Sequence, residues 1–306
     1  MPERTEKIGL LLPSREALLW ADSDLAFIVD VARRAEQAGY DSVWAGDSLL
    51  ARPRGEPLTL LAAVAGATDR VVLGTAVLLP LLRHPLSLAH ALATLDRIAK
   101  GRLVVAVGPG ADLPGTHAEL AAVGVPSDRR VNAMLSEVER CKRLWSNQEP
   151  GIQLQPTPDQ PGGPPIWLGG GGPRMLRLAG TTFDGWLPLS PTADAYAAGL
   201  RTVREAAVQA GRDPDSIAAG VYLTLAVADT AREAEGELDE YTKAYYGQPA
   251  EVMAKQMACH AGTLESAAEW FAGYRAAGAR HLVLRLARPG LKDYNATLRQ
   301  LLDAAQ

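Results

Sequence analysis

The chain has 306 residues, of which 47% are apolar and 22% charged, the composition of an ordinary globular protein. This length fits two ordinary domains or one large α/β barrel of about 250 residues. The 31 basic and 35 acidic residues give a net charge of −4, so no broad attraction to nucleic acid or to an anionic membrane is expected. Two distant cysteines, Cys141 and Cys259, exclude a disulfide framework.

The first residues do not resemble a targeting segment. MPERTEKIGLLLP carries charges within its first seven residues and then resembles a strand, not the apolar core of a signal peptide. The longest uncharged apolar stretch, residues 71–82, has 12 residues, whereas a membrane-spanning helix needs about 18–20. We therefore expect a soluble, cytoplasmic protein.

Short apolar runs alternate with longer stretches of helical periodicity. In chain order, apolar runs predict eight strands at 7–13, 41–47, 71–79, 102–107, 166–168, 185–189, 219–228 and 281–286. Helices are predicted at 24–39, 56–68, 85–100, 128–146, 173–180, 193–211 and 264–278, and a last helix ends the chain. The segment 230–262 predicts two or more helices, and 148–165, which has six prolines, predicts an extended loop.

Eight apolar strands that alternate with helices predict a parallel sheet covered on its outer face. A closed (β/α)8 TIM barrel and an open doubly wound sheet share this local pattern. The number of strands and the even composition favour a single α/β barrel domain over 1–306, with a loop insertion at about 111–165 and a helical insertion at about 230–262. Chemistry in such a barrel occurs at the carboxyl ends of the strands, so the residues after each run are candidate site residues.

The most informative run is LGGGGPRM, after the fifth predicted strand. Glycines let the backbone approach a ligand closely, and Pro173 suits the first turn of a helix. Free N–H groups at a helix start favour an anion, and Arg174 adds a charged contact. We therefore predict phosphate binding at Gly170, Gly171, Gly172 and Arg174. The alternative is a tight turn whose glycines only allow close packing.

Three other strand ends carry candidates. Asp47 either hydrogen-bonds the polar edge of a ligand or caps the backbone that follows it. Small residues at 74–76 either leave room for a planar ring or reflect the taper of a barrel. After the fourth strand, VGPGADLPG has Leu113 where a dinucleotide fingerprint needs glycine, and Pro114 and Gly115 argue against an immediate helix. That run predicts a backbone floor for a flat ligand, not a Rossmann site.

Several other chemistries lack their sequence patterns. There is no GxSxG elbow, Walker A motif or HExxH motif. Cys259 and His260, expected at a helix end, have no further ligands at metal spacing, so no metal site is predicted. A cofactor-free aldolase or isomerase would need a lysine or an acid–base pair at the strand ends, and neither is evident.

Together these pieces resemble the bacterial luciferase-like superfamily of flavin- and deazaflavin-dependent oxidoreductases. The matching phrases, in the family order, are AEQAGYDSVWAGDSL, RVVLGTAVLLP followed by RHP, LATLDRIAKGRLVVAVGPG, PPIWLGGGGPRMLRLAG with FDGWLP, and AGARHLVLRL. They cover nearly the whole chain. The resemblance implies an insertion-bearing TIM barrel with an isoalloxazine-type ring in its mouth, against the ends of strands two, three and four.

For individual residues, the resemblance implies that Asp47, Ala76, Val77 and Gly108 surround the ring. A non-prolyl cis peptide that backs the ring in the family would correspond to the bond between Ala76 and Val77. The cofactor phosphate would rest on residues 170–174, in agreement with the helix-start argument. Asp47 is the candidate catalytic residue, because it is the best polar group near the reacting centre.

Two positions depart from the family pattern. Ser48 stands where many members carry a histidine, and Ala111 stands where sugar-oxidising deazaflavin members carry a glutamate. A proton donor therefore cannot be carried over, and sugar phosphate oxidation is in doubt. The compact chain and the absence of the family histidine lead us to expect the deazaflavin coenzyme F420 in preference to FMN.

The predicted function is that of an F420- or FMN-dependent oxidoreductase that transfers hydride to or from a small organic substrate. One alternative is an FMN-dependent monooxygenase that uses O2 and reduced flavin from a separate flavin or F420 reductase; the other is a non-catalytic flavin-binding protein. The segment 230–262 is expected to flank the substrate entrance. Family members often dimerise, which implies a homodimer, although the sequence itself leaves the oligomeric state and the substrate open.

Overall fold

The computed structural model describes residues 6–20, 24–290 and 294–306. Its strands are β1 (Lys7–Leu11), β2 (Ser42–Ala45), β3 (Val72–Leu78), β4 (Leu103–Val107), β5 (Ile166–Leu168), β6 (Gly185–Trp186), β7 (Ala218–Val227), β8 (Cys259–Gly262) and β9 (His281–Leu286). Its helices are α1 (Glu16–Trp20), α2 (Ala26–Ala38), α3 (Pro57–Ala67), α4 (Pro85–Ile98), α5 (Pro114–Ala122), α6 (Arg130–Trp145), α7 (Pro173–Thr182), α8 (Ala193–Gln209), α9 (Ala231–Tyr246), α10 (Ala250–Met253), α11 (Leu264–Ala276) and α12 (Tyr294–Ala304), with the 3-10 turns η1 (Pro80–Leu82) and η2 (Pro214–Ser216).

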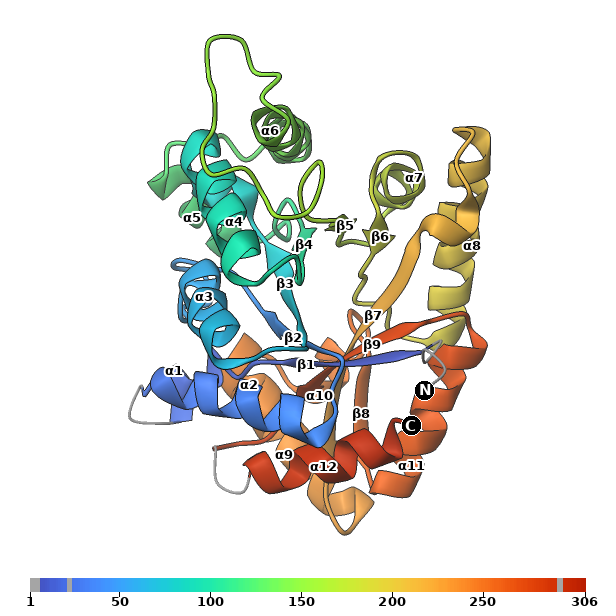
Figure 1. Cartoon of the computed structure of the whole chain (residues 1–306). Helices are drawn as coiled ribbons and strands as arrows, with labels where there is room; N and C mark the ends of the chain where they lie inside the picture. The colour runs from blue at the N-terminus through green and yellow to red at the C-terminus, as the bar shows by residue number, and fades with distance from the viewer. Residues whose placement is uncertain (1–5, 21–23, 291–293) are drawn as a thin grey trace.

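Eight of these strands close into a parallel barrel. β1 to β6 pair in chain order, β6 pairs with β7, β7 with β9, and β9 with β1, which completes the ring. Figure 1 shows the strands in the middle of the molecule, with α3, α4 and α6 along one side and α7 and α8 along the other. The predicted TIM barrel and the positions of all eight predicted strands are confirmed.

The strands are continuous apolar runs because both of their faces are covered. One face is covered by side chains inside the barrel and the other by the helices, so that all six residues of β9 are buried. Helix α2 shows the outer layer: it buries Ile28, Val31 and Ala35 against the barrel. It ends at Gly39, whose φ of 107° reverses the chain towards β2.

The barrel interior contains a buried polar chain. Trp44 Nε1 donates to Ser42 Oγ at 2.7 Å, and the same oxygen lies 2.7 Å from His281 Nε2. Burial, and to a lesser degree Lys7, lowers the pKa of His281 to about 3, so its ring is neutral. A Cβ at Gly74 would lie 2.1 Å from the Trp44 ring, so this glycine makes room for the tryptophan, not for a ligand.

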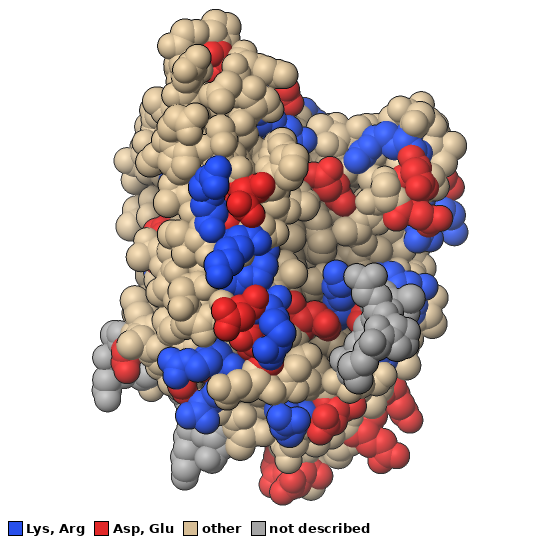
Figure 2. All heavy atoms as spheres, viewed as in Figure 1, with Lys and Arg blue, Asp and Glu red and all other residues tan. Residues whose placement is uncertain are grey.

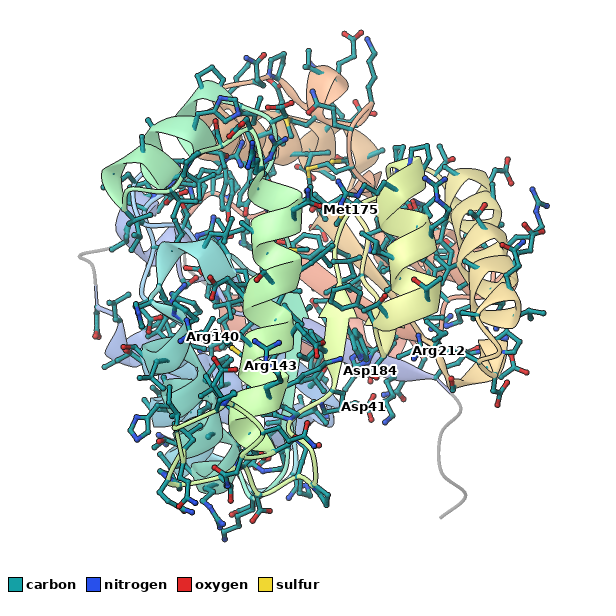
Figure 3. The ribbon with its side chains drawn as sticks, turned by 90° about the horizontal axis from the view of Figure 1, so that it is seen from above. Asp41, Arg140, Arg143, Met175, Asp184 and Arg212 are labelled. Carbon is teal, nitrogen blue, oxygen red and sulfur yellow. The ribbon has the colours of Figure 1, made fainter. Side chains whose placement is uncertain are left out.

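Carboxylates at the amino end of the barrel accept hydrogen bonds from backbone N–H groups of the strands. Asp41 Oδ2 accepts from the N–H of Ile8 at 2.7 Å, and Asp184 Oδ2 accepts from the N–H of Ile166 at 2.8 Å. Arg212 donates to the carbonyls that end α7, among them Gly180 O at 2.6 Å. Figure 3 shows Arg212 and Asp184 near one end of α7 and Met175 at the other end. The two ends of α7 therefore serve different faces of the barrel.

The structure corrects two sequence predictions about the insertions. The segment 230–262 is not helical throughout: after α9 and α10 it ends in β8, which pairs in parallel with β7 from Cys259↔Thr224 to Gly262↔Val227. Cys259 and His260 therefore lie in a strand and not at a helix end. The expected loop insertion at 111–165 also contains α5, which begins at Pro114, because the fixed φ of proline suits a first helical position.

The surface and the side-chain clusters give no separate site. Within the described residues, no helix combines the length and apolarity that a membrane span requires, and no three His, Cys, Asp or Glu side chains gather as metal ligands. On the face seen in Figure 2, lysine and arginine side chains alternate with aspartate and glutamate. The charge pattern of that face therefore marks no extended binding surface of one sign.

Candidate active site

A cavity of about 430 Å³ opens at the carboxyl end of the barrel. Of the residues predicted for the site, it is lined by Asp47, Ala76, Val77, Gly108, Gly170, Gly171 and Gly172, and Arg174 is not in its lining. A larger groove of about 610 Å³ lies between α8 and η2 on the outside of the molecule. The smaller cavity is the candidate site, because the strand ends carry the chemistry of a parallel barrel.

A bulge in β3 forms one side of the cavity. The pairing of β3 with β4 shifts register between Thr75 and Leu78, and the peptide bond between Ala76 and Val77 is cis, as the family resemblance implies. The Val77 side chain packs against two glycines: a Cβ would lie 2.8 Å from it at Gly108 and 3.0 Å at Gly169. These glycines therefore let the bulge and the next two strand ends approach one another closely.

Asp47 is buried and forms an ion pair with Arg83. Its Oδ2 accepts from Arg83 Nη1 at 2.6 Å and from the N–H of Leu79 at 3.0 Å, and its Oδ1 accepts from Arg83 Nη2 at 3.1 Å. Arg83 also donates to Glu56 at 2.6 Å. Burial lowers the pKa of Arg83, but the hydrogen bonds and charges of Asp47 and Glu56 outweigh burial and raise the pKa. Asp47 thus fixes the chain after β3 at the cavity wall.

A second buried carboxylate holds the loop after β2. Glu119 of α5 is 1% exposed, and its Oε1 accepts from Ser48 Oγ at 2.9 Å, from the N–H of Leu50 at 2.7 Å and from the N–H of Leu49. Ser48 Oγ in turn accepts from the N–H of Arg52 at 2.9 Å. Sequence analysis missed Glu119 because α5 was not expected. Ser48, which replaces the family histidine, is here a link between the loop and α5.

The glycine turn before α7 is open to a ligand. Gly170 has a φ of 108°, and a Cβ at Gly171 or Gly172 would meet nothing within 4 Å. Among the described residues, no acceptor bonds the N–H groups of Gly171 and Gly172, and Pro173 occupies the first helical position. Unpaired N–H groups at the start of a ten-residue helix fit an anionic group.

Arg174 lies at the rim of this turn and not inside the cavity. It is exposed, and its Nη2 donates to Asn132 Oδ1 of α6. Met175, the next residue, does line the cavity and lies at the mouth end of α7 (Figure 3). The structure thus brings the predicted glycines together and leaves the predicted arginine beside them.

The remaining wall combines cations with aromatic rings. We call it the arginine–tyrosine wall; it consists of Arg52, Arg54, Tyr222, Tyr245 and Tyr246. Two members, Tyr245 and Tyr246, come from the end of α9, so the insertion lines part of the cavity. Sequence analysis did not identify this wall. The available signals were the two arginines of ARPRGE directly after a strand end and the Tyr-Tyr pair that ends α9.

The fold is shared with solved oxidoreductase structures. An F420-dependent secondary alcohol dehydrogenase, in complex with an F420–acetone adduct, has a TM-score of 0.82 and 21% identity, over 98% of this chain and 99% of that chain. The oxygenating constituent of 3,6-diketocamphane monooxygenase from Pseudomonas putida, in complex with FMN, has a TM-score of 0.75 and 19% identity, over 97% and 96%.

Curated relatives are more similar in sequence but are only partly covered. The F420-dependent hydroxymycolic acid dehydrogenase of Mycobacterium tuberculosis is 30% identical over 72% of this chain and 65% of its own length. The F420-dependent glucose-6-phosphate dehydrogenase of Kineococcus radiotolerans is 33% identical over 68% and 66%. The chain thus spans slightly less than two thirds of the length of these relatives. Residues 7–282 match the family model described as luciferase-like monooxygenase, and the chain belongs to that family.

Proposed function

We propose that the protein is an oxidoreductase that binds a phosphate-bearing flavin-type cofactor in the barrel mouth and exchanges hydride with a small organic substrate. One observation carries this proposal: a single cavity joins the β3 bulge at Ala76 and Val77 to the unpaired N–H groups of Gly171 and Gly172. The bulge offers a wall for a planar ring, and the helix start offers a site for its phosphate.

Each part of the site has a distinct task. Gly170, Gly171 and Gly172 receive the phosphate through backbone N–H groups, and Arg174 adds positive charge at the rim. Gly108 and the bulge face the ring. When bound, the cofactor would supply a two-electron hydride acceptor or donor. Because both oxygens of Asp47 are engaged, we assign it a positioning role for the wall and no proton transfer.

We propose coenzyme F420 in preference to FMN. The two curated relatives described above are both named as F420-dependent, and one of the solved structures with this fold contains an F420 adduct. Ala111 lines the cavity where sugar-oxidising members carry glutamate, so we do not assign a sugar phosphate as substrate. The FMN-containing structure keeps the monooxygenase alternative as an outcome of the test; in that case a separate reductase would supply reduced flavin.

The test is a binding titration of the full chain with oxidised F420 and with FMN, followed by cofactor fluorescence. Gly171→Asp is the informative variant, because a side chain fits the open space there and its charge opposes a phosphate. Gly171→Asn is its neutral control. We expect Gly171→Asp to weaken cofactor binding about tenfold or more relative to Gly171→Asn.

Three results distinguish the alternatives. Tighter binding of F420 than of FMN, followed by substrate-dependent oxidation of reduced F420, supports the proposal. Tighter binding of FMN, with substrate-dependent O2 consumption when reduced FMN is supplied, assigns the monooxygenase alternative. If neither cofactor binds, or if Gly171→Asp binds as tightly as Gly171→Asn, the cofactor site is not where we place it.

A further inference from the structure

Three arginines from two strand ends surround the tyrosine pair that ends α9. The Cζ atom of Arg15 lies 5.0 Å from the centroid of the Tyr245 ring, and that of Arg54 lies 5.8 Å from the same centroid. Arg52 Cζ lies 4.9 Å from the Tyr246 centroid. Guanidinium groups at these distances are attracted by the ring faces, which hold them beside the tyrosine pair without neutralising them.

A fourth arginine lies behind the tyrosines. Arg285 of β9 is 2% exposed, and its Cζ lies 4.8 Å from the Tyr245 centroid and 5.1 Å from the Tyr246 centroid. Its Nε and Nη2 donate to Thr224 Oγ1 at 3.1 and 2.8 Å, and its Nη1 donates to Tyr246 Oη at 2.5 Å. All of these partners are neutral, so the charge of Arg285 adds to the positive field at the wall.

These arginines form no direct ion pairs within the part of the chain that the structure describes. Among residues 6–20, 24–290 and 294–306, none of Arg15, Arg52, Arg54 and Arg285 takes part in an ion pair. Glu16, which accepts from Tyr241 Oη, is the acidic group whose charge acts on Arg15 and Arg54. Burial lowers the pKa of Arg15, and the charges of Arg54 and Arg52 lower it further, against Tyr245 and Glu16.

Arg54 is the member placed to contact a ligand. Its Nε donates to Arg52 O at 3.2 Å, and its two Nη groups have no acceptor among the described residues. Nη1 lies 2.1 Å from the point that a Cβ of Gly46 would occupy, and that point is 3.5 Å from Ala76 O. The guanidinium therefore lies beside the β3 bulge, with unused donors in a cavity that Arg54 itself lines.

We propose that the arginine–tyrosine wall binds an anionic group of the substrate, a carboxylate or a phosphate, with Arg54 as the principal contact and Arg52 as the second. This inference rests on the proposed function, because the glycine turn then takes the phosphate of the cofactor and leaves these arginines for a second anion. Arg52 and Arg54 are half-buried and have no ion-pair partner among the described residues, so an anionic ligand would find charged donors available for charge-assisted hydrogen bonds. An acidic tail of the cofactor has the same chemistry and is distinguished by the test.

The test is isothermal titration calorimetry of the full chain, alone and loaded with cofactor, with straight-chain carboxylates from acetate to octanoate and the matching neutral amides. We expect at least one carboxylate to bind about tenfold to 100-fold more tightly than its amide. Arg54→Met should abolish this preference, Arg54→Lys should retain part of it, and both should leave cofactor affinity within about twofold. Arg34→Met, at an exposed arginine of α2, is the matched control and should change nothing.

The outcomes separate the anion sources. If each amide binds as tightly as its carboxylate, or if Arg54→Met keeps the preference, the proposal is overturned. If Arg54→Met weakens cofactor binding and not carboxylate binding, the wall holds the cofactor tail. Thermal unfolding of Arg54→Met and of Arg54→Lys checks that both variants are folded. The titration of the chain alone needs no cofactor. If no cofactor binds, the proposed function is overturned, while the carboxylate titration still tests the arginine–tyrosine wall.

Discussion

The two ends of the barrel differ in whether their charged side chains have partners within the protein. At the amino end, Asp41, Asp184 and Glu36 accept hydrogen bonds from backbone N–H groups. Glu36 alone accepts from those of Asp69, Arg70 and Val71 at 2.6–3.2 Å. At the carboxyl end, the arginines around the tyrosine pair have no carboxylate partner among the described residues.

This difference separates stability from ligand binding within one ring of strands. Satisfied polar groups at the amino end hold the strands in register and leave nothing for a ligand to contact. Donors at the mouth that have no protein partner remain available to a ligand. Arg83, also at the mouth, differs from the arginines of the wall because Asp47 and Glu56 both pair with it.

The largest effect on the free energy of unfolding is expected at Arg83. Arg83→Met leaves the Asp47 carboxylate, whose side chain is 1% exposed, without its cation, and should lower the free energy of unfolding by about 3–5 kcal/mol. Chemical denaturation measures this loss of unfolding free energy. Arg97→Met removes an exposed arginine whose Nη1 lies 3.8 Å from Asp159 and should cost at most about 1 kcal/mol. Equal losses in the two variants would show that the ion pair of Asp47 is not structural.

The next effect concerns pH at the amino end. The folded state keeps His281 neutral, with a pKa of about 3, whereas the unfolded chain takes up a proton near pH 6.5. Because the folded-state pKa is lower, this residue makes stability fall as the pH drops below about 6.5. The loss amounts to about 2 kcal/mol between pH 6.5 and 4.5. The difference in unfolding free energy between the protein and His281→Asn should shrink by this amount from pH 6.5 to pH 4.5. A difference that stays constant over this range would contradict the prediction.

Asp184→Ala should sharpen the contrast between the two ends. The variant leaves the N–H of Ile166 without its acceptor and should cost about 1.5 kcal/mol of unfolding free energy. Cofactor and carboxylate affinities should stay unchanged, because Asp184 lies at the end of α7 away from Met175 (Figure 3). Asp159→Ala, at a carboxylate with only a weak exposed ion pair, is the control for stability. A change in affinity in Asp184→Ala would mean that the two ends are coupled.

The smallest effect tests the support of the tyrosine pair. Thr230 Oγ1 accepts from the N–H of Glu233 at 3.3 Å and donates to its carboxylate at 2.9 Å, which caps the start of α9. Thr230→Ala should cost about 1 kcal/mol. Thr202→Ala, inside α8, replaces a poorer helix former and should be neutral or slightly stabilising. Thermal unfolding distinguishes Thr230→Ala from Thr202→Ala. Equal melting temperatures of the two variants would show that this cap does not stabilise α9.

Sequence reasoning worked where one local pattern decides the structure. Buried parallel strands need continuous apolar runs, so β1 to β7 and β9 could be located from their residues. The turn after β5 could be predicted as well, because four glycines before a proline have few other uses. β8 was missed because its four residues, CHAG, are too mixed to show a strand pattern.

The arginine–tyrosine wall was out of reach for a different reason. Arg54 and Tyr245 are separated by about 190 residues, and only the closure of the barrel brings them together. Asp47 illustrates the same limit: its position at a strand end could be predicted, but its ion pair with Arg83 depends on the fold of the chain after β3. Contacts between distant segments decide which polar residues remain available to a ligand.

The pairing of β7 has a consequence for redesign of the mouth. Ala218 and Ala219 pair with β6 and close the circle of strands, whereas the stretch from Thr224 to Val227 pairs with β8. The β6 pair and the β8 pair therefore use different residues of β7, while Thr224 and Leu225 pair with both β8 and β9. A graft that exchanges residues 228–262 for the equivalent part of another family member would keep every strand pair of the circle. It would replace Tyr245 and Tyr246 of the arginine–tyrosine wall and leave Arg52 and Arg54 in place.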